Sequence, residues 1–313
     1  MSPSSAPAII LDCDPGHDDA VALVVAAAHT RLLGITTVAG NAPLAATTRN
    51  AIVMRDLLGL DVQVHAGAER PFVAEPKHAG YVHGESGLDG PALPEPSGPP
   101  ASHDAVGFII ETCRANEGTW LVPTGPLTNV ALALRCAPDL AGRIAGISLM
   151  GGGTFGNRSA IAEFNIWADP ESAAVVYGYG GPLIMSGLDL THQLQATPER
   201  VAQVRALPGT VPAIFADLFD FFSATYVGRH HAMRGAAVHD PCAVMALTHP
   251  QLFATTPSRV AVETAGELTR GQTVIDRRDL VEVPEPNCVV QVGLDADAAW
   301  GVIVEAIAAH AGA

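Results

Sequence analysis

The stretch Ala8-Ile-Ile-Leu-Asp-Cys-Asp-Pro-Gly-His-Asp-Asp19 joins a short apolar run to a cluster of four carboxylates. The consecutive apolar residues at 8–11 are typical of a buried strand, and the Ala- and Val-rich residues 18–28 predict a helix. Between them, Pro15-Gly16 form a turn pair. The stretch therefore predicts the strand, turn and helix that begin a βαβ unit.

The same alternation of strand and helix continues along the chain. Short β-rich runs predict further strands at residues 33–38, 62–65, 120–122, 144–150 and 183–185. Ala-rich runs between them predict helices at residues 44–58, 106–115, 127–134 and 173–177. Strands separated by helices of this length favour a mostly parallel central sheet with helices on both faces. We therefore expect one α/β domain over residues 1–313.

Three segments depart from this alternation. Residues 66–102 are rich in Pro, Gly and His, and a loop of this length is usually functional or disordered. Residues 226–239, with His230 and His231, are expected to form a mobile flap. Near the C-terminus, β-like runs at 259–263, 273–276 and 287–292 predict a small antiparallel appendage, which a helix at 297–309 follows.

Acidic residues outnumber basic ones in this chain. Its 313 residues include 17 Lys and Arg against 32 Asp and Glu, a formal net charge of −15. This balance argues against partners bound through phosphate neutralisation, so we expect neither a nucleic acid nor an anionic membrane surface. No apolar run approaches the roughly 20 residues of a membrane span. With no signal-peptide pattern and five cysteines without paired spacing, the sequence predicts a cytoplasmic protein with buried free thiols.

The four carboxylates between residues 12 and 19 indicate a metal site. Asp12 and Asp14 lie two residues apart at a strand end and so share one face. Asp18 and Asp19 fall at a helix start, where the helix dipole favours negative charge. Helix capping explains one or two of these acids but not all four, because crowded carboxylates that lose their hydration repel one another. Either some are protonated or a cation lies among them, and hard oxygen ligands favour calcium or magnesium.

A second interpretation of Asp12 and Asp14 is an Asp-nucleophile phosphatase. Such sites also open with Asp-x-Asp at a strand end. They normally need a small residue and then Thr or Val after the second Asp, and a Lys or Arg further on to hold the phosphoryl group. This chain has Pro15-Gly16 at those places, and its one lysine, Lys77, lies in a predicted loop. The pattern therefore argues against a phosphatase without excluding it.

The stretch from Asp12 to Asp19 resembles the signature of the nucleoside hydrolases, the inosine–uridine-preferring nucleoside N-ribohydrolases. Further segments similar to that family follow in order at residues 35–41 (ITTVAGN), 82–88 (VHGESGL), 123–129 (PTGPLTN), 149–153 (LMGGG), 162–165 (AEFN) and 238–241 (VHDP). Together they span nearly the whole chain. The resemblance implies the nucleoside hydrolase fold and hydrolysis of the N-glycosidic bond of ribonucleosides, of the inosine or uridine type, to free base and ribose.

In that family a calcium ion activates the attacking water, and the resemblance assigns its ligands. Asp14 would bind Ca²⁺ and act as base toward the water that the ion holds. Asp19, Asp240 and the carbonyl oxygen of Thr124 would be the other protein ligands. A metal of this kind lowers the pKa of its water and orients it toward the anomeric carbon.

The resemblance also assigns side chains to the substrate. Asp18 would hold a ribose hydroxyl, and Asp240 would also face the substrate. His239 would protonate the leaving base, and His83 would lie on the base side. The other matched positions would grip the ribose or line the pocket: Asn41, Met150, Asn157, Glu163 and Asn165. From the predicted flap, Tyr226 is expected to contact the base.

A catalytically silent nucleoside- or ribose-binding protein of the same fold is the main alternative. It predicts the loss of a calcium ligand, yet Asp14, Asp19, Thr124 and Asp240 are all present. The resemblance further implies a homodimer or homotetramer. The preference for purine or pyrimidine bases stays open, because it would lie in the two loops that the sequence leaves undefined.

Overall fold

A central sheet of eight strands organises the computed structural model, which describes residues 6–228, 232–278, 282 and 284–311. The strand order is β3-β2-β1-β4-β5-β6-β12-β9, and neighbours are parallel except for the antiparallel pair β12 and β9. The strands are β1 (Ala8–Cys13), β2 (Arg31–Thr37), β3 (Val64–Ala66), β4 (Trp120–Pro123), β5 (Gly146–Met150), β6 (Leu183–Ser186), β9 (Phe253–Ser258) and β12 (Cys288–Leu294). The predicted, mostly parallel α/β sheet is confirmed.

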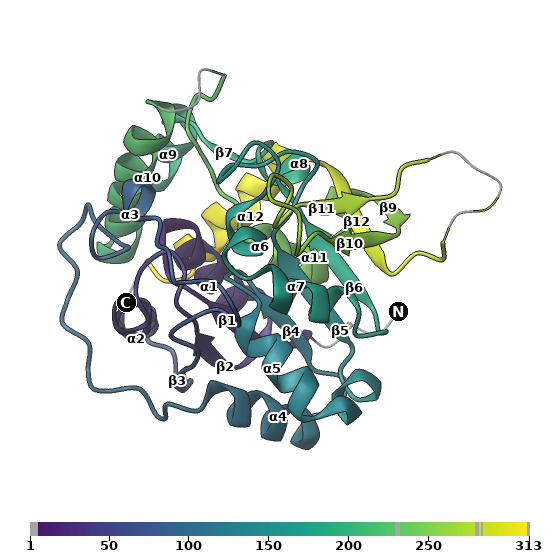
Figure 1. Cartoon of the computed structure of the whole chain (residues 1–313). Helices are drawn as coiled ribbons and strands as arrows, with labels where there is room; N and C mark the ends of the chain where they lie inside the picture. The colour runs from purple at the N-terminus through teal and green to yellow at the C-terminus, as the bar shows by residue number, and fades with distance from the viewer. Residues whose placement is uncertain (1–5, 229–231, 279–281, 283, 312–313) are drawn as a thin grey trace, which may run out of the picture.

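Helices cover both faces of this sheet (Figure 1). Their bounds are α1 (His17–His29), α2 (Leu44–Leu57), α3 (Gly80–His83), α4 (Ala105–Ala115), α5 (Thr128–Cys136), α6 (Phe164–Ala168), α7 (Pro170–Tyr177), α8 (Leu188–Thr191), α9 (Pro198–Arg205), α10 (Thr210–Val227), α11 (Pro241–Thr248) and α12 (Ala296–Ala308). Two single 3₁₀ turns, η1 (Pro138–Gly142) and η2 (Pro250–Leu252), complete the helical elements of the described residues.

Each face of the sheet has its own apolar core, because alternate residues of a strand point to opposite sides. Ile9 and Leu11 of β1 belong to the larger core, to which α1, α2, α10, α11 and α12 contribute. Ile10, between them, belongs to the second core with α4, α5 and α7. All three side chains are fully buried. The continuous apolar run at 8–11 therefore reflects burial of β1 on both faces.

The sheet reverses its strand order between β1 and β4. From β1 the chain proceeds outward to β2 and β3, and it then returns to place β4 on the other side of β1. Asp12 and Pro123 are paired at the carboxyl ends of these two strands, and the backbone N–H of Thr124 donates to the Asp12 carbonyl at 2.8 Å. In open α/β sheets, ligands bind outside the carboxyl ends of the strands at such a reversal.

The predicted C-terminal appendage is only partly right. β10 (Val260–Val262) and β11 (Thr273–Ile275) form a separate antiparallel pair, as expected. The run predicted at 287–292 is instead β12, which enters the main sheet between β6 and β9. Strand-like composition does not reveal the partner of a strand, and β12 pairs with an element about 100 residues earlier in the chain.

The two irregular segments also differ from expectation. Residues 66–102 are mostly irregular but contain α3. Tyr226 lies inside α10 rather than in a flap, and β8 (Ala236–Ala237) pairs with β7 (Gln195–Ala196) soon afterwards. His230 and His231 lie outside the described residues.

Four of the cysteines are buried and all five are free, but Cys136, at the end of α5, is exposed, so the prediction of buried thiols is wrong at this position. Within the described part of the chain, no helix combines the length and the apolar character that a membrane crossing requires.

Candidate functional site

A cavity lies at the carboxyl edge of the sheet, above the reversal between β1 and β4. It collects residues that follow β1, β2, β4 and β5, together with residues of α3, α6 and α10. All predicted site residues except Asp14 and Asp19 line it: Asp18, Asn41, His83, Thr124, Met150, Asn157, Glu163, Asn165, Tyr226, His239 and Asp240. Five further residues complete the lining: Ala79, Tyr81, Val82, Phe164 and Phe222.

Asp19 lies beneath this cavity, held by donors from three segments of the chain. Its Oδ1 accepts from the Thr124 hydroxyl at 2.8 Å and from the Asp14 backbone N–H at 3.3 Å. Its Oδ2 accepts from the Gly16 backbone N–H at 2.9 Å and from the Asn41 side-chain amide at 3.2 Å. The carboxylate is therefore fixed in place by the turn between β1 and α1 and by the loops that follow β2 and β4.

Asp14 occupies a slot that two glycines leave open. Its Oδ2 accepts from the Asn41 backbone N–H at 2.6 Å, whereas its buried Oδ1 has no hydrogen-bond partner. A Cβ atom on Gly40 would lie 2.0 Å from Asp14 Oδ2, and one on Gly125 would lie 2.3 Å from Oδ1. Only residues without a side chain fit at these two positions while Asp14 keeps its orientation.

Asp18, Asp19 and Asp240 form a buried cluster in which one carboxylate oxygen from each lies within 4.8 Å of the others. Burial, and then the charge of Asp19, raises the pKa of Asp18 to about 8. Burial also raises the pKa of Asp240 well above its usual value, and the charges of Asp18 and Asp19 add to the shift. Asp14 is not a member of this cluster, although burial and the Asp19 charge raise its pKa as well.

The cluster fits a divalent cation. Crowded buried carboxylates are costly unless they are protonated or share a positive charge, and the charges that act on Asp14 and Asp240 here are those of other aspartates. The orphaned Oδ1 of Asp14 is a further oxygen atom that its surroundings leave without a donor. An all-oxygen donor set suits hard cations such as calcium and magnesium.

Asp240 belongs both to the start of α11 and to the carboxylate cluster. Asp240 is the N-cap residue of α11 and Pro241 is its first residue, as the sequence His-Asp-Pro predicts. The Asp240 side chain makes no capping hydrogen bond. It interacts instead with the carboxyl group of Asp19, which belongs to α1.

Three further polar side chains of the cavity lining are held by backbone groups. Glu163 accepts from the backbone N–H groups of Gly152 and Asn165, both at 2.9 Å, and burial raises its pKa to about 7. The Asn165 amide donates to the Thr124 carbonyl at 2.7 Å, which leaves that oxygen its second lone pair. Asn157 accepts from the Phe164 backbone N–H at 2.9 Å. These groups can therefore present fixed polar atoms to a ligand.

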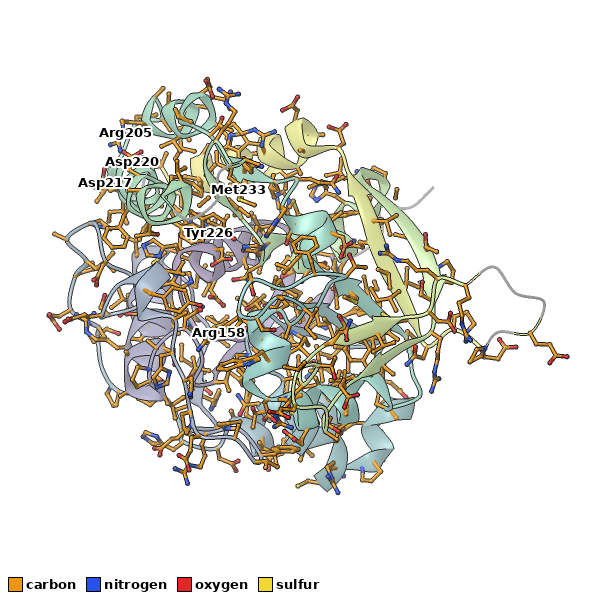
Figure 2. All side chains as sticks on the ribbon, turned by 45° about the horizontal axis from the view of Figure 1, so that its top comes forward. Arg158, Arg205, Asp217, Asp220, Tyr226 and Met233 are labelled. Atoms are coloured by element: carbon orange, nitrogen blue, oxygen red, sulfur yellow. The ribbon has the colours of Figure 1, made fainter. Side chains whose placement is uncertain are left out.

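His239, which precedes Asp240 in the lining of the cavity, lies between two hydroxyl groups. Its Nδ1 is 2.7 Å from the Thr191 hydroxyl, and its Nε2 is 2.8 Å from the Tyr226 hydroxyl. Tyr226 points from α10 into the interior, whereas Arg205, Asp217 and Asp220 gather at the outer surface of α9 and α10 (Figure 2). Burial raises the pKa of Tyr226, so its hydroxyl stays protonated.

Sequence reasoning missed the partners of the two site histidines. His17 Nδ1 lies 3.0 Å from His83 Nδ1, and both rings stack near Phe222. His17 belongs to the motif at residues 12–19, so the sequence could have indicated that it lies beside the site. Nothing in the sequence marks Thr191 or Phe222, because a Thr in a short helix and a Phe in an apolar helix are ordinary residues at such positions.

Comparison with known proteins identifies the family that this sequence resembles. Residues 9–301 match the family model described as inosine-uridine preferring nucleoside hydrolase. The chain is 44% identical over 307 residues to the pyrimidine-specific ribonucleoside hydrolase RihA of Shewanella sp. (strain MR-7), covering 96% of both chains. It is 44% identical over 292 residues to RihA of Escherichia coli (strain SMS-3-5 / SECEC), covering 92% of this chain and 94% of the relative.

A solved structure shows the same fold. The purine-preferring ribonucleoside hydrolase from Gardnerella vaginalis superposes with a TM-score of 0.91 at 33% identity, covering 97% of this chain and 98% of that structure. The match extends over the central sheet, the helical layers and the small antiparallel pairs. The chain therefore belongs to the inosine-uridine preferring nucleoside hydrolase family and is a nucleoside N-ribohydrolase.

Proposed function

We propose that this protein is a calcium-dependent hydrolase of pyrimidine ribonucleosides, releasing the free base and ribose. The observation that carries the proposal is the group of buried aspartates beneath a polar cavity, with one carboxylate oxygen of Asp14 left without a hydrogen-bond donor. Family membership supports the reaction. The names of the RihA relatives support the pyrimidine preference, which the sequence motifs had left open.

The residues that would hold the cation are Asp14, Asp19, Asp240 and the carbonyl oxygen of Thr124. Asp18 lies close enough to Asp19 and Asp240 to contribute charge to the same site. A divalent cation, when bound, supplies Lewis acidity that lowers the pKa of a coordinated water. The chain contributes the fixed orientation of the acids, since Asn41 donates to both Asp14 and Asp19.

Asp14 is placed to take the proton of the attacking water. Its Oδ2 is occupied by the Asn41 backbone N–H, and its Oδ1 has an unused lone pair. Burial raises the pKa of Asp14, and a bound cation would oppose this rise by favouring the charged form. The slot between Gly40 and Gly125 leaves room for this orientation, and the hydrogen bond from the Asn41 backbone N–H holds it.

The remaining acids suit the charge that develops on the ribose. Cleavage of a glycosidic bond passes through a state that resembles an oxocarbenium ion, with positive charge on the ring. Asp18 and Glu163 line the cavity as buried carboxyl groups that can stabilise this charge and accept hydrogen bonds from ribose hydroxyls. A site built on such hydrogen bonds rejects substrates that lack the hydroxyl groups.

The leaving base needs a proton, and His239 is the proposed source. Its Nε2 is hydrogen-bonded to the Tyr226 hydroxyl, and both residues line the cavity. A proton on His239 Nε2 would therefore be separated by one hydroxyl group, that of Tyr226, from a base in the cavity. A histidine suits this task because its usual pKa of about 6.5 is close to neutral pH.

The phosphatase interpretation gains no support from this cavity. A phosphoryl group needs a positive side chain to hold it. None of the described residues that line the cavity is a lysine or an arginine. The silent binding protein is not supported either, since the chain belongs to an enzyme family and keeps every proposed ligand.

A steady-state panel tests the proposed activity. With calcium present, uridine and cytidine should be cleaved with a higher kcat/KM than inosine, adenosine and guanosine, and a chelator should abolish turnover of all five. Release of ribose, measured as reducing sugar, gives the rate. Faster cleavage of the purine nucleosides would refute the pyrimidine preference, and no cleavage of any ribonucleoside would refute the reaction itself.

Calcium should stabilise the fold independently of turnover. A cation that binds only the folded state at 100 times its Kd adds about 2.7 kcal/mol to the free energy of unfolding. We expect the Tm to rise on calcium addition and to return to its starting value with chelator, as measured by calorimetry. Asp19→Asn should lose this response. Asp297→Asn is the control, because its carboxylate is 97% exposed and lies outside the cavity. An unchanged Tm in the unmodified protein would contradict a calcium site.

Asp14→Asn should remove the base and spare the fold. General-base catalysis is worth about 10²–10⁴-fold, so kcat for uridine should fall by that factor. The amide is nearly isosteric and removes a buried charge, so the Tm measured with chelator should not decrease. A variant that keeps most of its kcat would show that another group accepts the proton.

His239→Ala should slow the cleavage of poor leaving groups selectively. The expected loss in kcat for uridine is about 10²–10⁴-fold. A 4-nitrophenyl riboside, whose leaving group departs without a proton, should be cleaved at nearly the original rate. Turnover is measured as ribose release from uridine and as nitrophenolate release from the riboside. An equal loss of kcat on both substrates would count against His239 as the acid.

A further inference from the structure

The backbone carbonyl of Asp89, the side chain of His17 and the side chain of His83 are linked by two short contacts beside the cavity. His17 Nε2 lies 2.9 Å from the backbone carbonyl oxygen of Asp89. His17 Nδ1 lies 3.0 Å from Nδ1 of His83, which lines the cavity. Both imidazoles are buried, with His17 1% and His83 6% exposed. His17, which does not line the cavity, therefore connects the Asp89 carbonyl to His83, which does.

The carbonyl of Asp89 determines which nitrogens carry protons. A carbonyl oxygen can only accept, so His17 Nε2 must carry the proton of that 2.9 Å contact. A neutral imidazole with a proton on Nε2 has a lone pair on Nδ1. His83 Nδ1 faces this lone pair at 3.0 Å and must therefore donate. His83 is then left with an unprotonated Nε2.

The reverse arrangement is less favourable. It would place the His17 proton on Nδ1 and let His83 Nδ1 accept it, together with the His17 backbone N–H at 3.3 Å. It would also set the lone pair of His17 Nε2 against the Asp89 carbonyl at 2.9 Å. Two acceptors facing each other at 2.9 Å repel, whereas the first arrangement gives up only the longer, 3.3 Å hydrogen bond from the His17 backbone N–H. The favoured arrangement is therefore the one with protons on His17 Nε2 and His83 Nδ1, which makes the 2.9 Å and 3.0 Å contacts.

We propose that His17 is a positioning residue that presents His83 to the substrate as a hydrogen-bond acceptor, through the contacts Asp89 C=O···His17···His83. The chemistry that His83 Nε2 recognises is a donor of the nucleoside, either a ribose O–H or a base N–H. His17 makes no contact with the substrate itself, because it does not line the cavity. The inference rests on the proposed function for the identity of the ligand, but the tautomer of His83 does not depend on it.

Aromatic packing holds this arrangement rigid. The His17 ring stacks against Phe221 and Phe222 with centroid distances of 5.3 and 5.2 Å, and against His83 at 5.3 Å. Phe222 also stacks on His83 at 5.3 Å. A Cβ on Gly16 would lie 2.7 Å from His83 Nδ1, so the loop before α1 also closes on this ring. Neither imidazole can turn over without displacing these neighbours.

Two variants of His17 distinguish its role as a hydrogen-bond acceptor for His83 from its role in aromatic stacking. His17→Phe keeps an aromatic ring but removes the acceptor that faces His83. His17→Asn loses the ring, but its amide oxygen can take the place of Nδ1. His65→Phe is the matched control, because His65 is also a buried histidine stacked on a phenylalanine, Phe108, with centroids 3.9 Å apart, and it does not line the cavity.

The first readout is the tautomer itself. In the calcium-loaded protein labelled with ¹⁵N-histidine, two-bond proton–nitrogen correlations should show His83 protonated at Nδ1, with the signal assigned by its loss in His83→Asn. His17→Asn should keep this pattern, and His17→Phe should move the proton to Nε2. A proton on Nε2 of His83 in the unmodified protein would overturn the proposal, whether or not any nucleoside is cleaved.

The second readout is kinetic. One hydrogen bond is worth about two- to tenfold in binding, so His17→Phe should raise KM for uridine by that factor with a smaller change in kcat. His17→Asn and His65→Phe should stay near the original KM. If His17→Asn is impaired as much as His17→Phe, the effect comes from packing and the acceptor role is refuted.

Substrate analogues identify the donor. 2′-, 3′- and 5′-deoxyuridine each lack one ribose hydroxyl, and 3-methyluridine lacks the base N–H. The analogue without the recognised donor should be a poorer substrate than uridine for the original protein but not for His17→Phe, whose His83 no longer accepts. If His17→Phe discriminates against all four analogues as strongly as the original protein, the proposal fails. Failure to cleave uridine at all would instead refute the proposed function and leave the tautomer result standing.

Discussion

The burial of four carboxyl groups, those of Asp14, Asp18, Asp19 and Asp240, is the constraint on which the rest of the site depends. All four are at most 5% exposed, and burial is the largest cause of the rise in each pKa. Such a group is stable only with shared protons or a shared cation. Their neighbours supply hydrogen-bond donors that hold the oxygens in place, and the glycines beside Asp14 leave room for its carboxylate. The cavity beside them is therefore lined by polar atoms that are held in fixed positions.

The sheet brings these acids together. Asp14, Asp18 and Asp19 follow β1, Thr124 follows β4, and Asp240 enters at the start of α11. Because β4 pairs directly with β1, the loops after both strands meet at one edge, where the order of the sheet reverses. The same edge receives the histidines from α3 and from the residues before α11. The residues proposed to bind the metal, the ribose and the base are therefore adjacent, although they are separated by more than 200 positions in the chain.

Family resemblance and local pattern predicted most of this site, and the gaps have specific causes. The dense motif at residues 12–19 identified the acids because no ordinary structural role explains four of them in eight residues. Tyr226 was expected in a flap, but it lies on α10, whose apolar pattern reflects its place in the core. The strand at Cys288–Leu294 was assigned to the appendage because strand composition says nothing about pairing partners.

The sequence by itself determined the alternating α/β class, the buried β1 and the carboxylates at its end, since these depend on neighbours a few residues apart. Tertiary structure alone decided the position of β12 beside β6, the contacts of His239 with Thr191 and Tyr226, and the pairing of His17 with His83. Tyr226 and His239 are 13 residues apart, and the other contacts join segments at least 48 residues apart. Hydrogen-bond direction and tautomer depend on atoms brought within about 3 Å by folding, and no local pattern of residues encodes such a meeting.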